Sequence, residues 1–175
     1  MSQAAIESNS SEVSRLIAGA AEAIAKTPYC WLVTMGATGD ARLRPMGRLK
    51  PDPGDSAWTV RFVTDGRSRK ASDIRRAAKV SVLFQHGDDA FVTLSGLAKL
   101  REGESEVRPR WRRAYDPYFP SEQDRANAAF LEVDADRMEL WIRGVTPEPF
   151  GMRTTTLERD ATGVWRLISG DRAAA

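Results

Sequence analysis

Hydrophobic and polar residues follow two different periods along the chain. Between residues 11 and 26, apolar side chains recur at helical spacing, which predicts an amphipathic helix. From residue 29 onward, segments rich in β-branched and aromatic residues are separated by Gly, Pro and Asp, which predicts strands and turns. Gly96 is expected to mark a bulge, and residues 51–55 a turn. The predicted strands cover residues 29–35, 41–50, 57–64, 80–85 and 90–100, with two more within 130–143.

Helical segments are predicted to flank these strands. Residues 68–78 form a short helix with Ser68 as its N-cap, because a serine there accepts a backbone N–H group of the first turn. Residues 104–127 are helical with interruptions at proline, and residues 144–175 add a C-terminal strand pair. Because hairpin-like links join most strands and crossover helices are few, the pattern predicts a mainly β, α+β fold: an antiparallel barrel with flanking helices.

Length and composition fit one domain over residues 1–175, with residues 1–10 expected to be flexible. Hydrophobic residues make up 42% and charged residues 29%, which excludes collagen-like, coiled-coil and wholly disordered classes. No apolar run reaches the roughly 18 residues of a membrane helix, and the first residues lack the features of a signal peptide. The expected location is therefore the cytoplasm. One cysteine and one histidine supply neither an internal disulfide nor a zinc site, so no metal is expected.

Positive charge is concentrated in one part of the chain. Residues 42–79 hold 11 Lys or Arg against 4 Asp, whereas the whole chain has a net charge of +2. Such an excess favours an anionic partner. Ser68, Arg69 and Lys70 would lie at the start of the 68–78 helix, where free N–H groups attract anions and cations are unfavourable without one. The segment therefore indicates a phosphate site, with solvated surface cations as the alternative.

Three other features are interpreted as structural. Residues 108–113, R-P-R-W-R-R, have the basic and aromatic character of a nucleic-acid binder, but they follow an acidic segment and fit a solvated helix with Trp111 packed inward. No nucleic acid is therefore expected as a partner. Cys30 lies in a strand pattern and is expected to be a buried thiol, and His86 lies in a surface turn.

An ordered series of short motifs spans about residues 13–143. After the leading helix come W-L-V-T (31–34), R-P-M (44–46), V-T-D-G-R-S-R-K (63–70), V-S-V-L-F-Q (80–85), F-V-T-L-S-G-L-A (91–98), Y-F-P (118–120) and M-E-L-W (138–141). In this order and spacing the chain resembles the FMN-binding split barrels related to pyridoxamine 5'-phosphate oxidase, especially their general stress protein branch. The resemblance implies an antiparallel split β-barrel that binds FMN.

The resemblance also implies roles for particular residues. The FMN phosphate would be held by Arg44, Ser68, Arg69 and Lys70. The isoalloxazine ring would meet Pro45 and Met46, backbone groups of Val63 and Thr64, and the amide of Gln85. Trp141 would reach the flavin of the other subunit of a homodimer, with core packing as the alternative reading.

The expected function is that of an oxidoreductase acting through flavin redox chemistry on an unidentified small molecule. Since the flavin itself transfers electrons or hydride, no catalytic side chain is expected. The alternatives are a flavin-binding or sequestering protein without catalysis, and a deazaflavin- or haem-linked relative. Pyridoxamine 5'-phosphate oxidases carry an Arg-x-His pair after the late tryptophan, whereas no histidine follows His86 in this sequence. That oxidase activity is therefore not expected.

Overall fold

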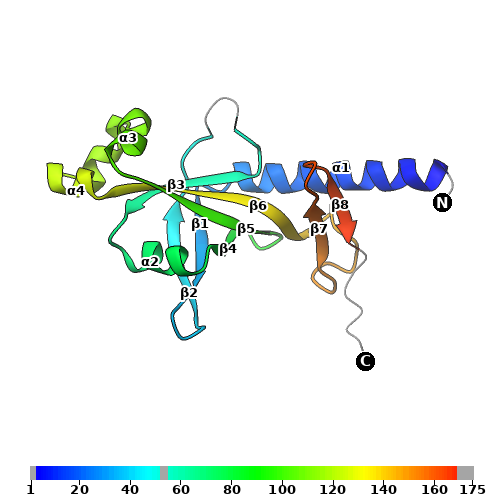
Figure 1. The fold of residues 1–175 in the computed structure, drawn as a ribbon. Coiled ribbons are helices and arrows are strands. Elements are labelled where there is room, and N and C mark those ends of the chain that lie inside the picture. Colours follow the sequence, from blue (N-terminus) through cyan, green and yellow to red (C-terminus); the bar gives the residue numbers. More distant parts are fainter. Residues whose placement is uncertain (1–2, 52–54, 169–175) are drawn as a thin grey trace.

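The computed structural model describes residues 3–51 and 55–168 (Figure 1). The helices are α1 (Gln3–Ala25), α2 (Arg69–Arg76), α3 (Glu104–Val107) and α4 (Glu122–Ala126), with 3₁₀ turns η1 (Arg108–Arg110) and η2 (Arg113–Tyr118). The strands are β1 (Tyr29–Met35), β2 (Ala41–Gly47), β3 (Thr59–Asp65), β4 (Lys79–His86), β5 (Ala90–Glu102), β6 (Ala128–Ile142), β7 (Thr155–Arg159) and β8 (Trp165–Ile168).

The strands form one antiparallel sheet in the order β2-β1-β4-β5-β6-β7-β8, and β3 pairs with the first half of β6. The long strand β6 therefore has β3 and then β7 along the same edge, while β5 lies along the other. The backbone N–H of Leu49 donates to the carbonyl of Arg61 at 2.8 Å, which links the chain after β2 to β3. The sheet thus curls toward closure. The antiparallel α+β barrel predicted from the sequence is confirmed.

A bulge lies in the middle of β6. The register with β5 shifts between Ser95 and Gly96, which leaves Asp136 as the extra residue. A Cβ at Gly96 would lie 2.0 Å from the carbonyl oxygen of Asp134, so only glycine allows the two backbones to come this close. The expected bulge at Gly96 is confirmed. The two strands predicted within 130–143 are one strand, because the polar residues between them belong to this bulge and not to a turn.

The main core fills the inside of the curled sheet. Inward residues alternate along β1, β3 and β4 with outward ones, as in Leu32, Phe62 and Val82, all fully buried. α1 contacts β4, β5, β6 and β8, and Leu16 and Ala20 on it are fully buried (Figure 1). A smaller cluster formed by Val107, Tyr115, Phe119, Ala128 and Phe130 lies under the α3–α4 segment.

Other boundaries differ from the sequence-based expectation. α1 begins at Gln3, eight residues before the predicted start, and β2 ends at Gly47. The predicted turn over 51–55 includes residues 52–54, which lie outside the described residues, as do residues 1–2 and 169–175. The C-terminal strand pair is present as β7 and β8. No helix in the described part of the chain is long and apolar enough to cross a membrane.

Candidate functional site

Lys70 and Arg44 form a cationic pair where β2, β3 and α2 meet. The ammonium Nζ of Lys70 donates to Oγ1 of Thr64 at 2.8 Å, and Lys70 makes no ion pair among the described residues. Burial, and then repulsion from the Arg44 guanidinium, lowers the pKa of Lys70, although the Asp65 carboxylate opposes this. Arg44 pairs with the carboxylate of Asp73, whereas the ammonium of Lys70 has no carboxylate partner among the described residues. The pair is therefore suited to an anion.

The start of α2 adds backbone donors to this pair. Ser68 has extended backbone geometry, and its Oγ accepts from the N–H of Ala71 at 3.4 Å, which confirms it as the N-cap. The N–H groups of Arg69 and Lys70 make no hydrogen bond with another described residue. The first turn holds no acidic residue, and the Arg69 side chain is exposed. This arrangement of backbone donors and cations is suited to an anion of the size of phosphate.

Asp73, on the buried face of α2, connects the cations to β1 and was not identified from the sequence. Its carboxylate accepts from Oγ1 of Thr34 at 2.9 Å and from Nη1 of Arg42 at 3.2 Å. Nη2 of Arg44 and Nη2 of Arg76 each lie 3.5 Å from it. Burial alone would raise the pKa of Asp73, but the Thr34 hydrogen bond and the three guanidinium groups together hold that pKa below its ordinary value. Asp73 is therefore ionised at neutral pH.

The residues expected beside the flavin ring lie on different faces. Pro45 lies opposite Trp31 and faces outward, whereas Met46 packs against the main core. Val63 is partly buried against the smaller cluster under α3–α4. The hydroxyl of Thr64 already accepts a hydrogen bond from Lys70. β3 pairs only with β6 among the described strands, so backbone groups along its other edge are not used by a second strand.

Gln85 and Trp141 line a cavity of about 370 Å³ on the outer face of the sheet. The amide of Gln85 donates to the carbonyl of Gly87 at 3.0 Å. The cavity holds no charged residue, and its walls come from Trp31, Leu83, Phe84, Gln85, Phe91, Thr93, Trp141, Phe150 and Gly151. The Arg143 guanidinium lies 4.4 Å from the ring centre of Phe150 and supports that wall. Sequence reasoning missed Phe150 because it belongs to the irregular segment between β6 and β7.

The cationic pair and this aromatic cavity lie on opposite faces of the β1–β2 hairpin. Leu32 pairs with Arg44 and points inward, whereas Trp31 pairs with Pro45 and points outward. None of the hydrogen bonds, ion pairs or ring contacts among the described residues joins Gln85 or Trp141 to Lys70 or Arg44. A single chain therefore does not unite all the predicted site residues.

Two reactive residue types lie apart from both groups. The Cys30 thiol is buried, and its Sγ lies 3.6 Å from the carbonyl oxygen of Met46. Burial raises the pKa of Cys30 to about 12, so the thiol stays protonated and unreactive at neutral pH. His86 is exposed at the end of β4. The buried thiol agrees with the expectation for Cys30, whereas His86, expected in a surface turn, is the exposed last residue of β4.

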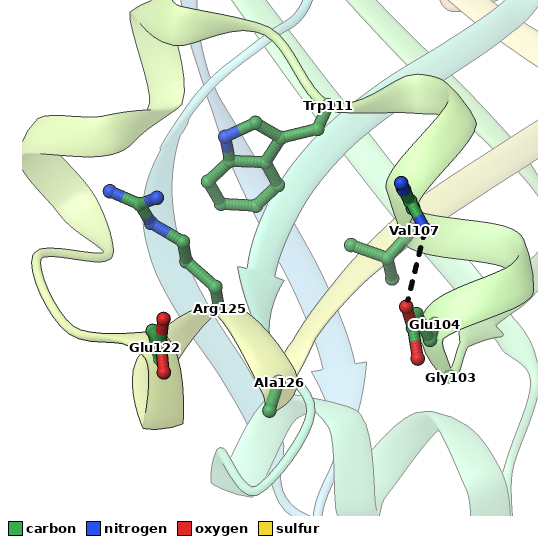
Figure 2. A pocket seen from close by; sticks show the side chains of 8 residues that line it. Gly103, Glu104, Val107, Trp111, Glu122, Arg125 and Ala126 are labelled. Carbon is green, nitrogen blue, oxygen red and sulfur yellow. Dashed lines mark ion pairs between the residues drawn. The ribbon is translucent and has the colours of Figure 1, made fainter.

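A larger cavity of about 750 Å³ lies between the α3 segment and α4 (Figure 2). Trp111 on its wall packs edge-on against the rings of Tyr115 and Phe119, so this tryptophan belongs to the smaller core. Arg108 and Arg110 each pair with the glutamate four residues earlier. The basic segment 108–113, whose first three residues form η1, is thus partly neutralised by the glutamates of α3.

The family follows from comparison with known proteins. Residues 17–154 match the model of the family described as "Pyridoxamine 5'-phosphate oxidase like", which is most of the chain. The chain belongs to this family. A comparison with curated protein sequences finds no match.

Solved structures share the fold at low sequence identity. A pyridoxamine 5'-phosphate oxidase-related, FMN-binding protein from Nostoc punctiforme has 17% identity and a TM-score of 0.64, with 87% of this chain and 94% of that chain covered. A protein from Clostridium acetobutylicum related to general stress protein 26 has 17% identity and a TM-score of 0.64, covering 82% and 93%. A haem-binding protein from Mycobacterium smegmatis has 16% identity and a TM-score of 0.56, covering 80% and 56%. At these identities the likeness establishes the fold alone.

Proposed function

We propose that this protein binds FMN and acts as a flavin-dependent oxidoreductase. The observation that carries the proposal is the partly buried Lys70 ammonium beside Arg44, without an ion-pair partner among the described residues. Together with the free N–H groups at the start of α2, this arrangement fits a phosphate dianion. The family match and the FMN-binding relative of the same fold agree with this ligand.

The flavin ring requires a second surface. The uncharged aromatic cavity around Trp141 and Trp31 fits a planar ring system, but it lies on the opposite face of the β1–β2 hairpin from Lys70. We infer a two-fold homodimer in which the cavity of one chain meets the ring of the flavin whose phosphate is bound by the other chain. Exposed Trp31, Tyr29 and Leu43 on the outer face would be covered by such a partner.

The protein's own residues would bind and orient the ligand rather than react. Lys70 and Arg44 would hold the phosphate, and the N–H groups of Arg69 and Lys70 would donate to its oxygens. The aromatic walls would exclude water from the ring. When bound, FMN supplies hydride or electron transfer. No lining residue of the aromatic cavity is an acid or a base, so the protein adds no proton-transfer group there.

Haem is the alternative ligand suggested by the relative that binds it. Haem iron takes an axial His, Cys, Met or Tyr ligand. Here the one histidine is exposed at the end of β4, and the one cysteine is buried with a raised pKa. Among the described residues, no His, Cys, Met or Tyr lines the aromatic cavity. These positions favour flavin over haem.

Mixing two defective chains tests the shared site. Lys70→Ala removes the phosphate contact of one chain, and Trp141→Ala alters the ring surface of the other. After subunit exchange, a mixed dimer would have one site with both lesions and one with neither. We expect tight FMN binding and fluorescence quenching to return for about one site per mixed dimer. Proven exchange without recovery, or a monomer by light scattering, would overturn the shared site.

A further inference from the structure

The carboxylate of Asp73 and the hydroxyl of Thr34 form a closed hydrogen-bonded ring with Arg44. Oγ1 of Thr34 accepts from Nη1 of Arg44 at 2.7 Å and donates to Oδ2 of Asp73 at 2.9 Å. Nη2 of the same guanidinium lies 3.5 Å from that Oδ2. Thr34 is 1% exposed and Asp73 is 2% exposed. Thr34 on β1 and Asp73 on α2 therefore hold the guanidinium of Arg44, on β2, at both of its terminal nitrogens.

This ring leaves part of the guanidinium available. Arg has five N–H donors in a rigid plane, and Thr34 and Asp73 engage one edge of the Arg44 group. The Arg44 side chain is only 20% exposed, yet it lies close enough to Lys70 to lower the pKa of that ammonium. The remaining donors can thus contact an anion bound beside Lys70.

The surrounding charges explain why a carboxylate is buried at this point. Asp73 is within ion-pair distance of Arg42, Arg44 and Arg76, so it offsets one of three neighbouring positive charges. Burying an ion pair brings little net stability, because desolvation cancels much of the attraction. The carboxylate does, however, fix the direction of the guanidinium groups that it binds. Because Asp40 also pairs with Arg42, the three arginines and two carboxylates leave the cluster with one surplus positive charge.

We propose that Asp73 and Thr34 are positioning residues that orient Arg44 toward the phosphate of the bound ligand. The inference rests on the proposed function, since it concerns how that same site holds a phosphate. It assigns a role to two residues to which the sequence analysis gave none. Neither residue contacts the ligand. Both act through Arg44.

Substitutions of Thr34 separate positioning from charge. Thr34→Val removes the hydroxyl while it keeps the volume and the charge of the cluster, and Thr34→Ser keeps the hydroxyl. Affinities for FMN and for riboflavin, which lacks the phosphate, are measured by fluorescence titration. We expect Thr34→Val to weaken FMN binding about tenfold, as for loss of a hydrogen bond to a charged group. We expect Thr34→Ser to restore it, and riboflavin affinity to stay unchanged in both variants.

Asp73→Asn and a matched control complete the test. Asp73→Asn removes a negative charge, which by itself would favour an anion, so a selective loss of FMN affinity in this variant would report lost positioning. Thr34→Val should add no further loss in an Arg44→Ala background. The control is Glu132→Gln, because Glu132 is equally paired with two arginines at 3.0 and 3.3 Å but lies outside the site. It should lower the melting temperature without changing the preference for FMN over riboflavin.

The failures of the two proposals are distinguishable. A wild-type protein that binds FMN no better than riboflavin overturns the proposed function. A wild-type preference for FMN that survives both Thr34→Val and Asp73→Asn overturns only the positioning roles. Equal losses of affinity for FMN and riboflavin in these variants would also contradict the positioning roles. Such losses would show a general structural defect, because riboflavin has no phosphate for Arg44 to contact.

Discussion

Lys70→Met should weaken FMN binding while it leaves the free protein at least as stable. The substitution keeps an apolar stem of similar length and removes the ammonium that donates to Thr64 at 2.8 Å. A hydrogen bond between charged groups contributes about 1.5–3 kcal/mol, or about tenfold to a hundredfold in affinity. We expect the upper part of this range, because Lys70 is already desolvated and repelled by Arg44 before the anion arrives.

The stability of the free protein gives the second half of this prediction. A lysine with a lowered pKa is less favourable as an ammonium in the folded chain than in the unfolded chain. Removing its charge should therefore leave the melting temperature unchanged or raise it. Opposite effects on stability and on affinity are typical of a residue kept for function.

The assay is a fluorescence titration with FMN and with riboflavin, next to a melting curve of the free protein. Lys79→Met is the matched control, because Lys79 is an exposed lysine at the start of β4. Lys79→Met should change neither the FMN affinity nor the melting temperature. Unchanged FMN affinity in Lys70→Met, or an equal loss for riboflavin, would refute the assignment of Lys70 to a phosphate.

Four further outcomes are expected. FMN affinity should decline as the pH is raised, at lower pH than an ordinary lysine would require, because the pKa of Lys70 is lowered by burial and by Arg44; titrations with Lys70→Arg, which stays charged, should show no such decline. Gly96→Ala should reduce the free energy of unfolding by about 2 kcal/mol or more, since its Cβ would lie 2.0 Å from a carbonyl oxygen; an unchanged urea midpoint would contradict this. Cys30 should react with a thiol reagent only after denaturation, because its pKa is raised to about 12; rapid labelling of the native protein would be inconsistent. Pyridoxamine and pyridoxine phosphates should not be oxidised, because no histidine follows Trp141; oxygen consumption at about 1 per second or more would disprove it.

Local sequence patterns predicted the fold, and they placed Ser68 and Lys70 close together, for physical reasons. The alternation along residues 29–35 and 80–85 follows from the period of a strand with one buried face. Ser68 and Lys70 lie two residues apart in the N-terminal turn of one helix, so their proximity does not depend on distant contacts. The bulge at Gly96 could be predicted because glycine within a strand marks close backbone approach.

Long-range packing determined the features that the sequence did not reveal. Asp73 meets Thr34 across 39 positions of sequence, and nothing in the segment around Asp73 specifies that contact. Pro45 and Met46 were expected to meet the same ring, but adjacent strand residues point to opposite faces. Phe150 reaches the aromatic cavity from a segment without regular structure. Such placements depend on how the sheet curls and not on local propensity.

The chromophore that purifies with the protein tests the central proposal most directly. The absorption spectrum of the protein is recorded, the ligand is released by denaturation, and its mass is determined. We expect a two-band flavin spectrum and the mass of FMN, with the amount of bound FMN reduced in Lys70→Met. A Soret band, a deazaflavin mass, or a colourless protein that does not bind added FMN would contradict it.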